Sequence, residues 1–265
     1  MIREPIEALV CDLDGVIYRG DEVIPGAPGA VERMRARGVR FLFWTNNSRA
    51  TVADYAHKLT GLGIETGHED VLTSAVVTAA ELKRRGFSGS RAYVIGGPGI
   101  RQALTGVGIE VVGPDAASGA DLIVVGWDLD FTFDAMRAAA VAVEAGATLV
   151  ATNDDAAYPA VDGLWPGTGA ILASIEVATG RRGEVMGKPH RPMLEAAADR
   201  LAGLEGIAAI GDRPETDLAG APSQGWATVL VLSGVTGPED AQRVEPRPDL
   251  IVESIAALPN ALGLD

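Results

Sequence analysis

Two carboxylates, one residue apart, follow the first apolar run of this 265-residue chain. Asp12 and Asp14 stand between the run at 8–11 and Gly15. Side chains two apart on a strand point the same way, so two like charges would crowd one face. Burying such a pair costs free energy unless a cation or a chemical task compensates. The stretch is therefore either a turn that ends a strand, for which Asp and Gly are common, or part of an active site.

Three further polar clusters stand after apolar runs or just before a late helix. In an open parallel sheet, ligands bind at the carboxyl ends of the strands, so these clusters are expected to meet at one edge. Each cluster taken singly has an ordinary explanation as a helix cap, a surface lysine or a turn. Their residues are Thr45, Asn46, Lys188, Asp212 and Asp217.

The charges of the combined set favour phosphoryl transfer to an aspartate. Four carboxylates in one crevice suit Mg²⁺, which keeps several waters and bridges carboxylates to a phosphate. Lys188 adds a compact cation that binds phosphate. Thr45 and the backbone beside Asn46 can donate to phosphoryl oxygens. A metal, a lysine and such donors around a carboxylate describe an aspartate nucleophile with its phosphate site.

The elements that must position these residues alternate between strands and helices. Continuous apolar runs predict strands that are buried on both faces of a parallel sheet. Helical periodicity predicts helices over 51–62, with Thr51 as the cap, and over 191–201. The pattern predicts an α/β, doubly wound fold, and so many strands favour a second, inserted sheet. The predicted strands are 8–11, 39–44, 91–95, 122–125, 148–151, 207–210, 228–232 and 249–252.

Composition limits the partners. The formal charge is −14 and the Lys and Arg residues form no basic stripe, so a nucleic acid polymer is not expected as a partner. Cys11 is the one cysteine, which excludes an internal disulfide, and its apolar surroundings predict a core position. The sequence shows no signal peptide and no apolar stretch of membrane-spanning length. We therefore expect a cytoplasmic protein without a membrane partner.

The motifs D-x-D-G, T-N, K and G-D-x-x-x-x-D, in this order, resemble those of the haloacid dehalogenase (HAD) superfamily of aspartate-nucleophile phosphatases. The chain is also similar to the large-cap branch of p-nitrophenyl, phosphoglycolate and nucleotide phosphatases. The resemblance implies a Rossmann-like catalytic core over 1–79 and 183–265, with an inserted α/β cap domain over 80–182. The segments that carry it are "WTNNSRATVADYAHKLTGLGI", "ATNDDAAYP", "PGTGAILASIEVATGRRGEVMGKP" and "IGDRPETDLAGAPSQGWATVLVLSGVT".

The resemblance also implies residue roles. Asp12 would attack phosphorus and form an aspartyl-phosphate, and Asp14 would protonate the leaving oxygen and then activate water. The Asp12 carboxylate, the Asp14 carbonyl and Asp212 would hold Mg²⁺, supported by Asp217 from behind. The phosphoryl oxygens would be held by Thr45, Asn46 and Lys188.

In the cap, the stretch "ATNDD" resembles a substrate loop of the branch, with Asn153 and Asp155 directed at the substrate. An ordinary Asx turn is the alternative. A second stretch, "GGPG" at 96–99, lacks the spacing of a nucleotide-binding loop and predicts a tight turn.

The leading function is thus a Mg²⁺-dependent phosphatase acting on a small phosphorylated metabolite. A phosphomutase on the same scaffold, a phospho-signalling receiver and a non-catalytic phosphate-binding scaffold are the alternatives. The sequence leaves open whether the chain forms a homo-oligomer through the cap.

Overall fold

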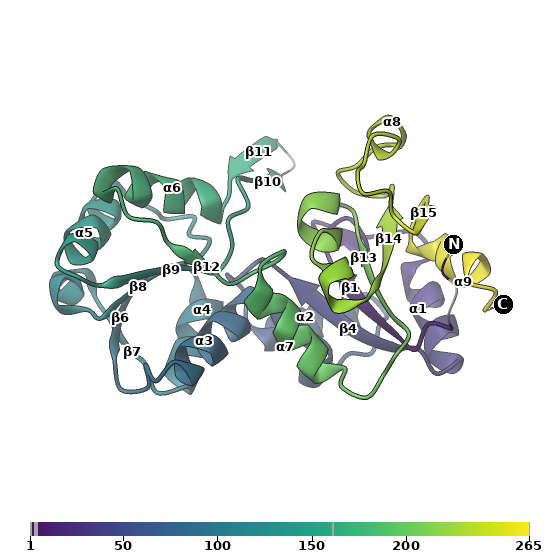
Figure 1. Cartoon of the computed structure of the whole chain (residues 1–265), viewed down its shortest axis with the longest axis horizontal. Coiled ribbons are helices and arrows are strands. Elements are labelled where there is room, and N and C mark those ends of the chain that lie inside the picture. The colour runs from purple at the N-terminus through teal and green to yellow at the C-terminus, as the bar shows by residue number, and fades with distance from the viewer. Residues whose placement is uncertain (1, 3–4, 161, 265) are drawn as a thin grey trace. The chain divides into compact units, whose positions relative to one another are not determined.

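A computed structural model describes residues 2, 5–160 and 162–264 of the chain. The chain divides into two compact units, and Figure 1 labels many of their helices and strands. The predicted cap, 80–182, falls inside the second unit, and its predicted boundaries stay a prediction. The first unit comprises Met1–Thr45, Tyr55–Leu72 and Leu194–Asp265, and the second comprises Asn46–Asp54 and Thr73–Met193.

The six-stranded sheet contains the N-terminal strand and has the order β15-β14-β13-β1-β4-β5. β1 pairs in parallel with β13 on one side and with β4 on the other. Every residue of β1 and β13 is buried, which is why 8–11 and 207–210 are unbroken apolar runs in the sequence. The strands are β1 (Ala8–Asp12), β4 (Arg40–Thr45), β5 (Val71–Thr73), β13 (Ile207–Gly211), β14 (Ala227–Val231) and β15 (Leu250–Val252).

Helices and short turns join these strands. The predicted cap of the second helix is confirmed: the Thr51 hydroxyl accepts from the Asp54 N–H (3.1 Å), and the Asp54 carboxylate accepts from the Thr51 N–H (2.9 Å). Cys11 lies fully buried in β1, as predicted. The remaining elements are β2 (Tyr18–Arg19), β3 (Glu22–Val23), α1 (Ala27–Ala36), α2 (Val52–Gly61), η1 (His68–Asp70), α7 (Arg191–Arg200), η3 (Pro214–Leu218), η4 (Ala221–Gln224), α8 (Pro238–Ala241), η5 (Ile255–Ala257) and α9 (Leu258–Ala261).

The second unit has its own five-stranded parallel sheet, in the order β12-β9-β8-β6-β7. Alternate side chains of its strands enter two different cores, as the two-residue period of a strand requires. Ala92 and Val94 pack with helices α3 and α4, whereas Tyr93 and Ile95 pack with α5 and α6. The elements are α3 (Ser74–Arg84), β6 (Arg91–Ile95), α4 (Pro98–Gly106), β7 (Glu110–Val112), η2 (Pro114–Gly119), β8 (Leu122–Val125), α5 (Phe133–Glu144), β9 (Thr148–Ala151), α6 (Thr168–Thr179) and β12 (Glu184–Val185).

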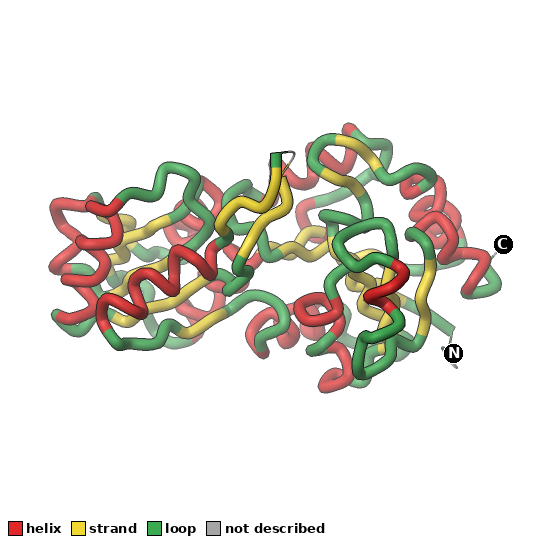
Figure 2. Tube along the Cα trace, turned by 90° about the horizontal axis from the view of Figure 1, so that it is seen from above, coloured by secondary structure: helices red, strands yellow, loops and turns green. Residues whose placement is uncertain are grey.

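A short antiparallel hairpin, β10 (Ala157–Ala160) and β11 (Gly163–Pro166), follows β9 and appears in Figure 2 as two neighbouring yellow strands. It is anchored by Trp127, whose ring lies 4.5 Å from that of Tyr158 between centroids and whose indole N–H donates to the Pro166 carbonyl.

The "GGPG" stretch opens helix α4, and the first turn of this helix bonds to the backbone at 48–49. The N–H groups of Gly99 and Ile100 donate to the carbonyls of Arg49 (2.8 Å) and Ser48 (3.1 Å). A Cβ atom on Gly99 would lie 2.1 Å from the Ala50 carbonyl oxygen, so glycine is needed here for close backbone packing. Among the described residues, no helix is both long and apolar enough to span a bilayer.

Candidate active site

Three buried carboxylates gather at one edge of the six-stranded sheet. Asp12 ends β1 and Asp212 directly follows β13, and these strands run parallel as neighbours. Asp217 lies five residues further, on the turn η3. One carboxylate oxygen from each of the three lies within 4.8 Å of the others. The predicted meeting of Asp12 with Asp212 and Asp217 is therefore seen in the structure.

The Asp212 carboxylate sits in a gap between two glycines. One oxygen, Oδ2, accepts from the Val235 N–H at 2.6 Å, and the Asp212 carbonyl accepts from the Thr236 hydroxyl at 2.6 Å. Cβ atoms on Gly15 and Gly234 would lie 2.3 and 1.9 Å from Oδ2. The loop after β14 thus determines where the carboxylate points.

Asp217 supports the same backbone from the other side. Its Oδ2 accepts from the N–H groups of Asp212 (3.2 Å) and Arg213 (3.0 Å). A Cβ on Gly211 would lie 2.2 Å from the Asp217 Cβ, so the turn closes only over a glycine. Asp217 is 2 % exposed, and its side chain orders the start of the loop that carries Asp212.

Asp14 and Thr45 lie near this edge by strand register. Asp12 is paired with Trp44 across β1 and β4, so Thr45 follows at the same end of the sheet and is 3 % exposed. Asp14 is half-buried in the turn after β1. Gly15 shapes that turn with a φ of +79°, and its N–H donates to the Tyr18 carbonyl at 2.8 Å.

The other predicted site residues, Asn46, Lys188, Asn153 and Asp155, come together within the second unit. Strand β12 pairs in parallel with β9, and the Met186 N–H extends this ladder to the Ala151 carbonyl (3.0 Å). The loops that leave β9 and β12 therefore start side by side, one carrying Asn153 and Asp155 and the other Lys188. Lys188 and Asn153 are each 2 % exposed and Asn46 is 6 % exposed.

A histidine and an aspartate join the same two loops. His190 Nε2 lies 3.0 Å from the Asp154 carboxylate. This hydrogen bond raises the pKa of the His190 imidazole and lowers the pKa of the Asp154 carboxyl. The pair is part-exposed and links the loop after β9 to the segment before α7.

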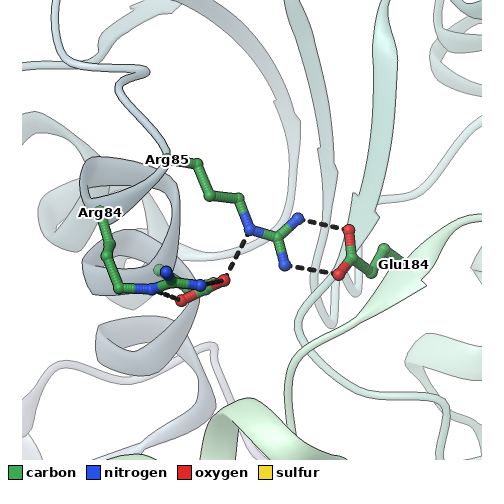
Figure 3. A network of polar contacts seen from close by, with 4 residues as sticks. Arg84, Arg85 and Glu184 are labelled. Carbon is green, nitrogen blue, oxygen red and sulfur yellow. Dashed lines mark hydrogen bonds and ion pairs between the residues drawn. The ribbon is translucent and has the colours of Figure 1, made fainter.

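The strand before Lys188 is held by an ion-pair network at the end of α3 (Figure 3). Arg85 bonds both carboxylate oxygens of Glu184 on β12, and its Nε donates to Glu81 at 2.6 Å. Arg84 also binds Glu81, and these hydrogen bonds lower the pKa of Glu81 to about 2. The network joins residues 99 positions apart and fixes β12 against α3.

The residues that hold the predicted site residues in place could not be predicted as functional from the sequence. Gly234 and Val235 around Asp212 and Gly187 beside Lys188 carry no chemistry of their own. Glycines that stand directly beside candidate residues were the available signal, because a missing Cβ permits close approach. Their partners are distant in sequence, so the signal could not say what approaches.

The carboxylate cluster is suited to binding a divalent cation. Three like charges this close repel one another strongly when buried, and a hard cation with oxygen ligands relieves the repulsion. A phosphoryl group could then approach the edge of the sheet despite the acidic charge of the chain.

Comparisons with known proteins agree with this arrangement. Residues 9–110 match the family model described as haloacid dehalogenase-like hydrolase, and residues 185–258 match the model described as HAD-hydrolase-like. An acid sugar phosphatase of Staphylococcus aureus is 34% identical over 238 residues, 89% of this chain and 90% of the relative.

Solved structures give the same answer. The p-nitrophenyl phosphatase of Archaeoglobus fulgidus is 31% identical, with a TM-score of 0.89 over 97% of this chain and 100% of its own. The glycerol phosphate phosphatase of Mycobacterium tuberculosis, solved in complex with magnesium, is 32% identical, with a TM-score of 0.88 over 96% of this chain and 76% of its own. The predicted resemblance is confirmed: the chain belongs to the haloacid dehalogenase-like hydrolases and is a phosphatase of that family.

Proposed function

We propose that the chain is a Mg²⁺-dependent phosphatase that hydrolyses small phosphate monoesters through an aspartyl-phosphate on Asp12. The observation that carries the proposal is the cluster of Asp12, Asp212 and Asp217, three buried carboxylates within 4.8 Å. Asp12 and Asp212 lie at the carboxyl ends of neighbouring parallel strands. Ligands bind at this end of open parallel sheets.

The donor set fits Mg²⁺, because carboxylate oxygens are hard ligands and the glycines around Asp212 leave its carboxylate room. The Asp12 and Asp212 carboxylates and the Asp14 main-chain carbonyl would hold the ion, with Asp217 supporting the Asp212 backbone. When bound, Mg²⁺ offsets the negative charge of the carboxylates and of the phosphoryl group.

The reaction proceeds in two displacements. A carboxylate oxygen of Asp12 attacks phosphorus while the bond to the leaving oxygen breaks, and Asp14 donates its proton to that oxygen. Asp14 then takes a proton from water, which attacks phosphorus and breaks the bond to Asp12. In this proposal the phosphoryl oxygens are held by Thr45, the main-chain N–H of Asn46 and the Lys188 ammonium. For Asn46 and Lys188 this role rests on the sequence motifs.

The substrate class is a phosphorylated sugar or small polyol. The support is the naming of relatives as acid sugar phosphatase and glycerol phosphate phosphatase. Asn153 and Asp155 stay the predicted cap residues for substrate choice, in the cap predicted at 80–182 between core segments 1–79 and 183–265. A cytoplasmic location and a homo-oligomer through the cap also stay predictions.

The test measures phosphate release from p-nitrophenyl phosphate and a panel of sugar and polyol phosphates. Mg²⁺ should be required, and EDTA should remove the activity. Asp12→Asn should lose turnover by at least about 10³-fold, because the nucleophile is gone, while its melting temperature stays near that of the wild type. Acid quenching with labelled substrate should trap phosphoprotein in the wild type only. Turnover by Asp12→Asn near the wild-type rate would refute the mechanism, and transfer of phosphate to a second sugar without its release would indicate a mutase.

A further inference from the structure

The side chain of Asn46 is fully occupied within the second unit. Its Oδ1 accepts from the Lys188 N–H at 2.7 Å, and its Nδ2 donates to the Lys188 carbonyl at 3.0 Å. The same Nδ2 donates to both oxygens of Asp155, at 3.2 Å each. One side-chain amide thus hydrogen-bonds both the N–H and the carbonyl of Lys188, as the backbone of a neighbouring strand would.

Asn46 is itself held from behind. Its carbonyl accepts from the Ser74 hydroxyl at 2.6 Å and from the Asn153 amide at 2.7 Å. The Asn153 oxygen accepts from the Asp155 N–H at 3.2 Å, which ties the loop after β9 into the same cluster. These bonds leave the Asn46 amide a single orientation.

Gly187 makes the contact possible. A Cβ at this position would lie 2.5 Å from Asn46 Oδ1 and 2.5 Å from the Thr152 carbonyl. No left-handed φ demands a glycine at this position, so the close approach alone requires one. The residue next to Lys188 is therefore shaped to admit the Asn46 amide.

We infer that Asn46 is a positioning residue: its side-chain amide sets the backbone of Lys188, and so the direction of the ammonium, in addition to the phosphate contact proposed for its main-chain N–H. Asp155 and Asn153 hold that amide in place. The inference rests on the proposed function only for the consequence in catalysis. Lys188 has a long, flexible stem, and a fixed, buried backbone reduces the conformations from which the ammonium must be selected.

The first experiment separates Asn46 from Lys188 by a double-mutant cycle. Asn46→Ala keeps the main-chain N–H and removes the two side-chain hydrogen bonds to the backbone of Lys188. We expect kcat/KM for p-nitrophenyl phosphate to fall on the order of 100-fold, the typical cost of a misplaced catalytic group. Asn46→Ala should cost little more in a Lys188→Ala background, because both changes remove one function. Asn260→Ala, an exposed asparagine in α9, is the matched control and should leave kcat/KM unchanged.

The second experiment reads the backbone directly. Hydrogen exchange of the Lys188 amide should accelerate at least about 10-fold in Asn46→Ala, since that N–H loses its acceptor, while amides of β8 in the same unit keep their rates. Gly187→Ala should also lower kcat/KM and accelerate exchange of the Lys188 amide, because its Cβ would push the Asn46 side chain away. Gly106→Ala, where a Cβ meets no atom within 4 Å, is its control.

A charge exchange tests the contact with Asp155. Asn46→Asp places two carboxylates together and should lower kcat/KM, and adding Asp155→Asn should recover part of the loss. The inference is overturned if the costs of Asn46→Ala and Lys188→Ala multiply, or if Asn46→Ala retains wild-type kcat/KM while Lys188→Ala does not. If Lys188→Ala retains full turnover, the phosphate role of Lys188 in the proposed function fails. In that case hydrogen exchange alone tests the positioning role of Asn46. An exchange rate of the Lys188 amide that is unchanged in Asn46→Ala overturns the inference.

Discussion

Gly234→Ala should weaken the affinity for the metal by displacing the carboxylate of Asp212. The new Cβ would lie 1.9 Å from Asp212 Oδ2, whereas ordinary contacts begin at 3.4 Å. The new Cβ would also lie 2.4 Å from the Asp212 Cβ, so turning the carboxylate away cannot relieve the clash by itself, and the loop with Val235 must move away from Asp212. A separation of about 1–1.5 Å lengthens the 2.6 Å bond from the Val235 N–H beyond hydrogen-bond range.

The expected magnitude follows from these contacts. Loss of a hydrogen bond to a charged group costs about 1.5–3 kcal/mol, and overpacking costs about 1–3 kcal/mol, so the melting temperature should fall. Changes to groups that orient metal ligands typically cost about 10- to 100-fold in metal affinity. We expect the Mg²⁺ concentration for half-maximal activity to rise by this factor, with a smaller change in activity at saturating Mg²⁺.

The assay is a Mg²⁺ titration of phosphate release with a thermal melt of each variant. Gly237→Ala is the matched control, because a Cβ there meets no atom within 4 Å and its φ is −82°. It should titrate as the wild type does. A Gly234→Ala variant that melts and titrates like Gly237→Ala would refute the reasoning that the loop after β14 positions Asp212 for the metal.

Two further outcomes are expected from the same structure. Ca²⁺ should inhibit the Mg²⁺-activated enzyme, because it is larger, takes 6–8 ligands and would misplace Asp12; activity in Ca²⁺ equal to that in Mg²⁺ would contradict this. Glu81→Gln should lower the free energy of unfolding at pH 7 by about 0.5–1 kcal/mol, since the Glu81 ion pairs are only partly shielded from water. The pKa of Glu81 is lowered from 4.5 to about 2 by its bonds to Arg84 and Arg85, so this stabilisation is complete above pH 4.5 and is lost as the pH falls toward 2. Urea midpoints that differ from the wild type equally at pH 7 and pH 3 would argue against it.

The central strands could be predicted from the sequence because a strand buried on both faces consists of consecutive apolar residues. The runs at 91–95, 122–125 and 148–151 are strands with the predicted bounds. Strands β12 and β11 were not predicted, since β12 has two residues and β11 is exposed along its length. The apolar pair of β11, Leu164 and Trp165, stands between a glycine and a proline, which predict a turn, and β12 is too short to form an apolar run. Each strand is defined by its pairing with a partner strand.

The same distinction applies to the site. The types of Asp12, Asp212 and Asp217, and their places after strands, already predicted a cluster of acidic groups, because parallel strands end at a common edge. The structure adds the direction of each carboxylate, which depends on the loop after β14 for Asp212.

By itself, the sequence determined the fold class, the order of the motifs and which side chains could do chemistry, since these follow from hydrophobic runs and residue types along short stretches. Only the tertiary structure decided which atoms of those residues are already engaged. The amide of Asn46 grips Lys188 across 142 positions, and Arg85 reaches Glu184 across 99. Hydrogen bonds act over about 3 Å, so their partners are set by where the folded chain brings two loops together, which no local pattern specifies.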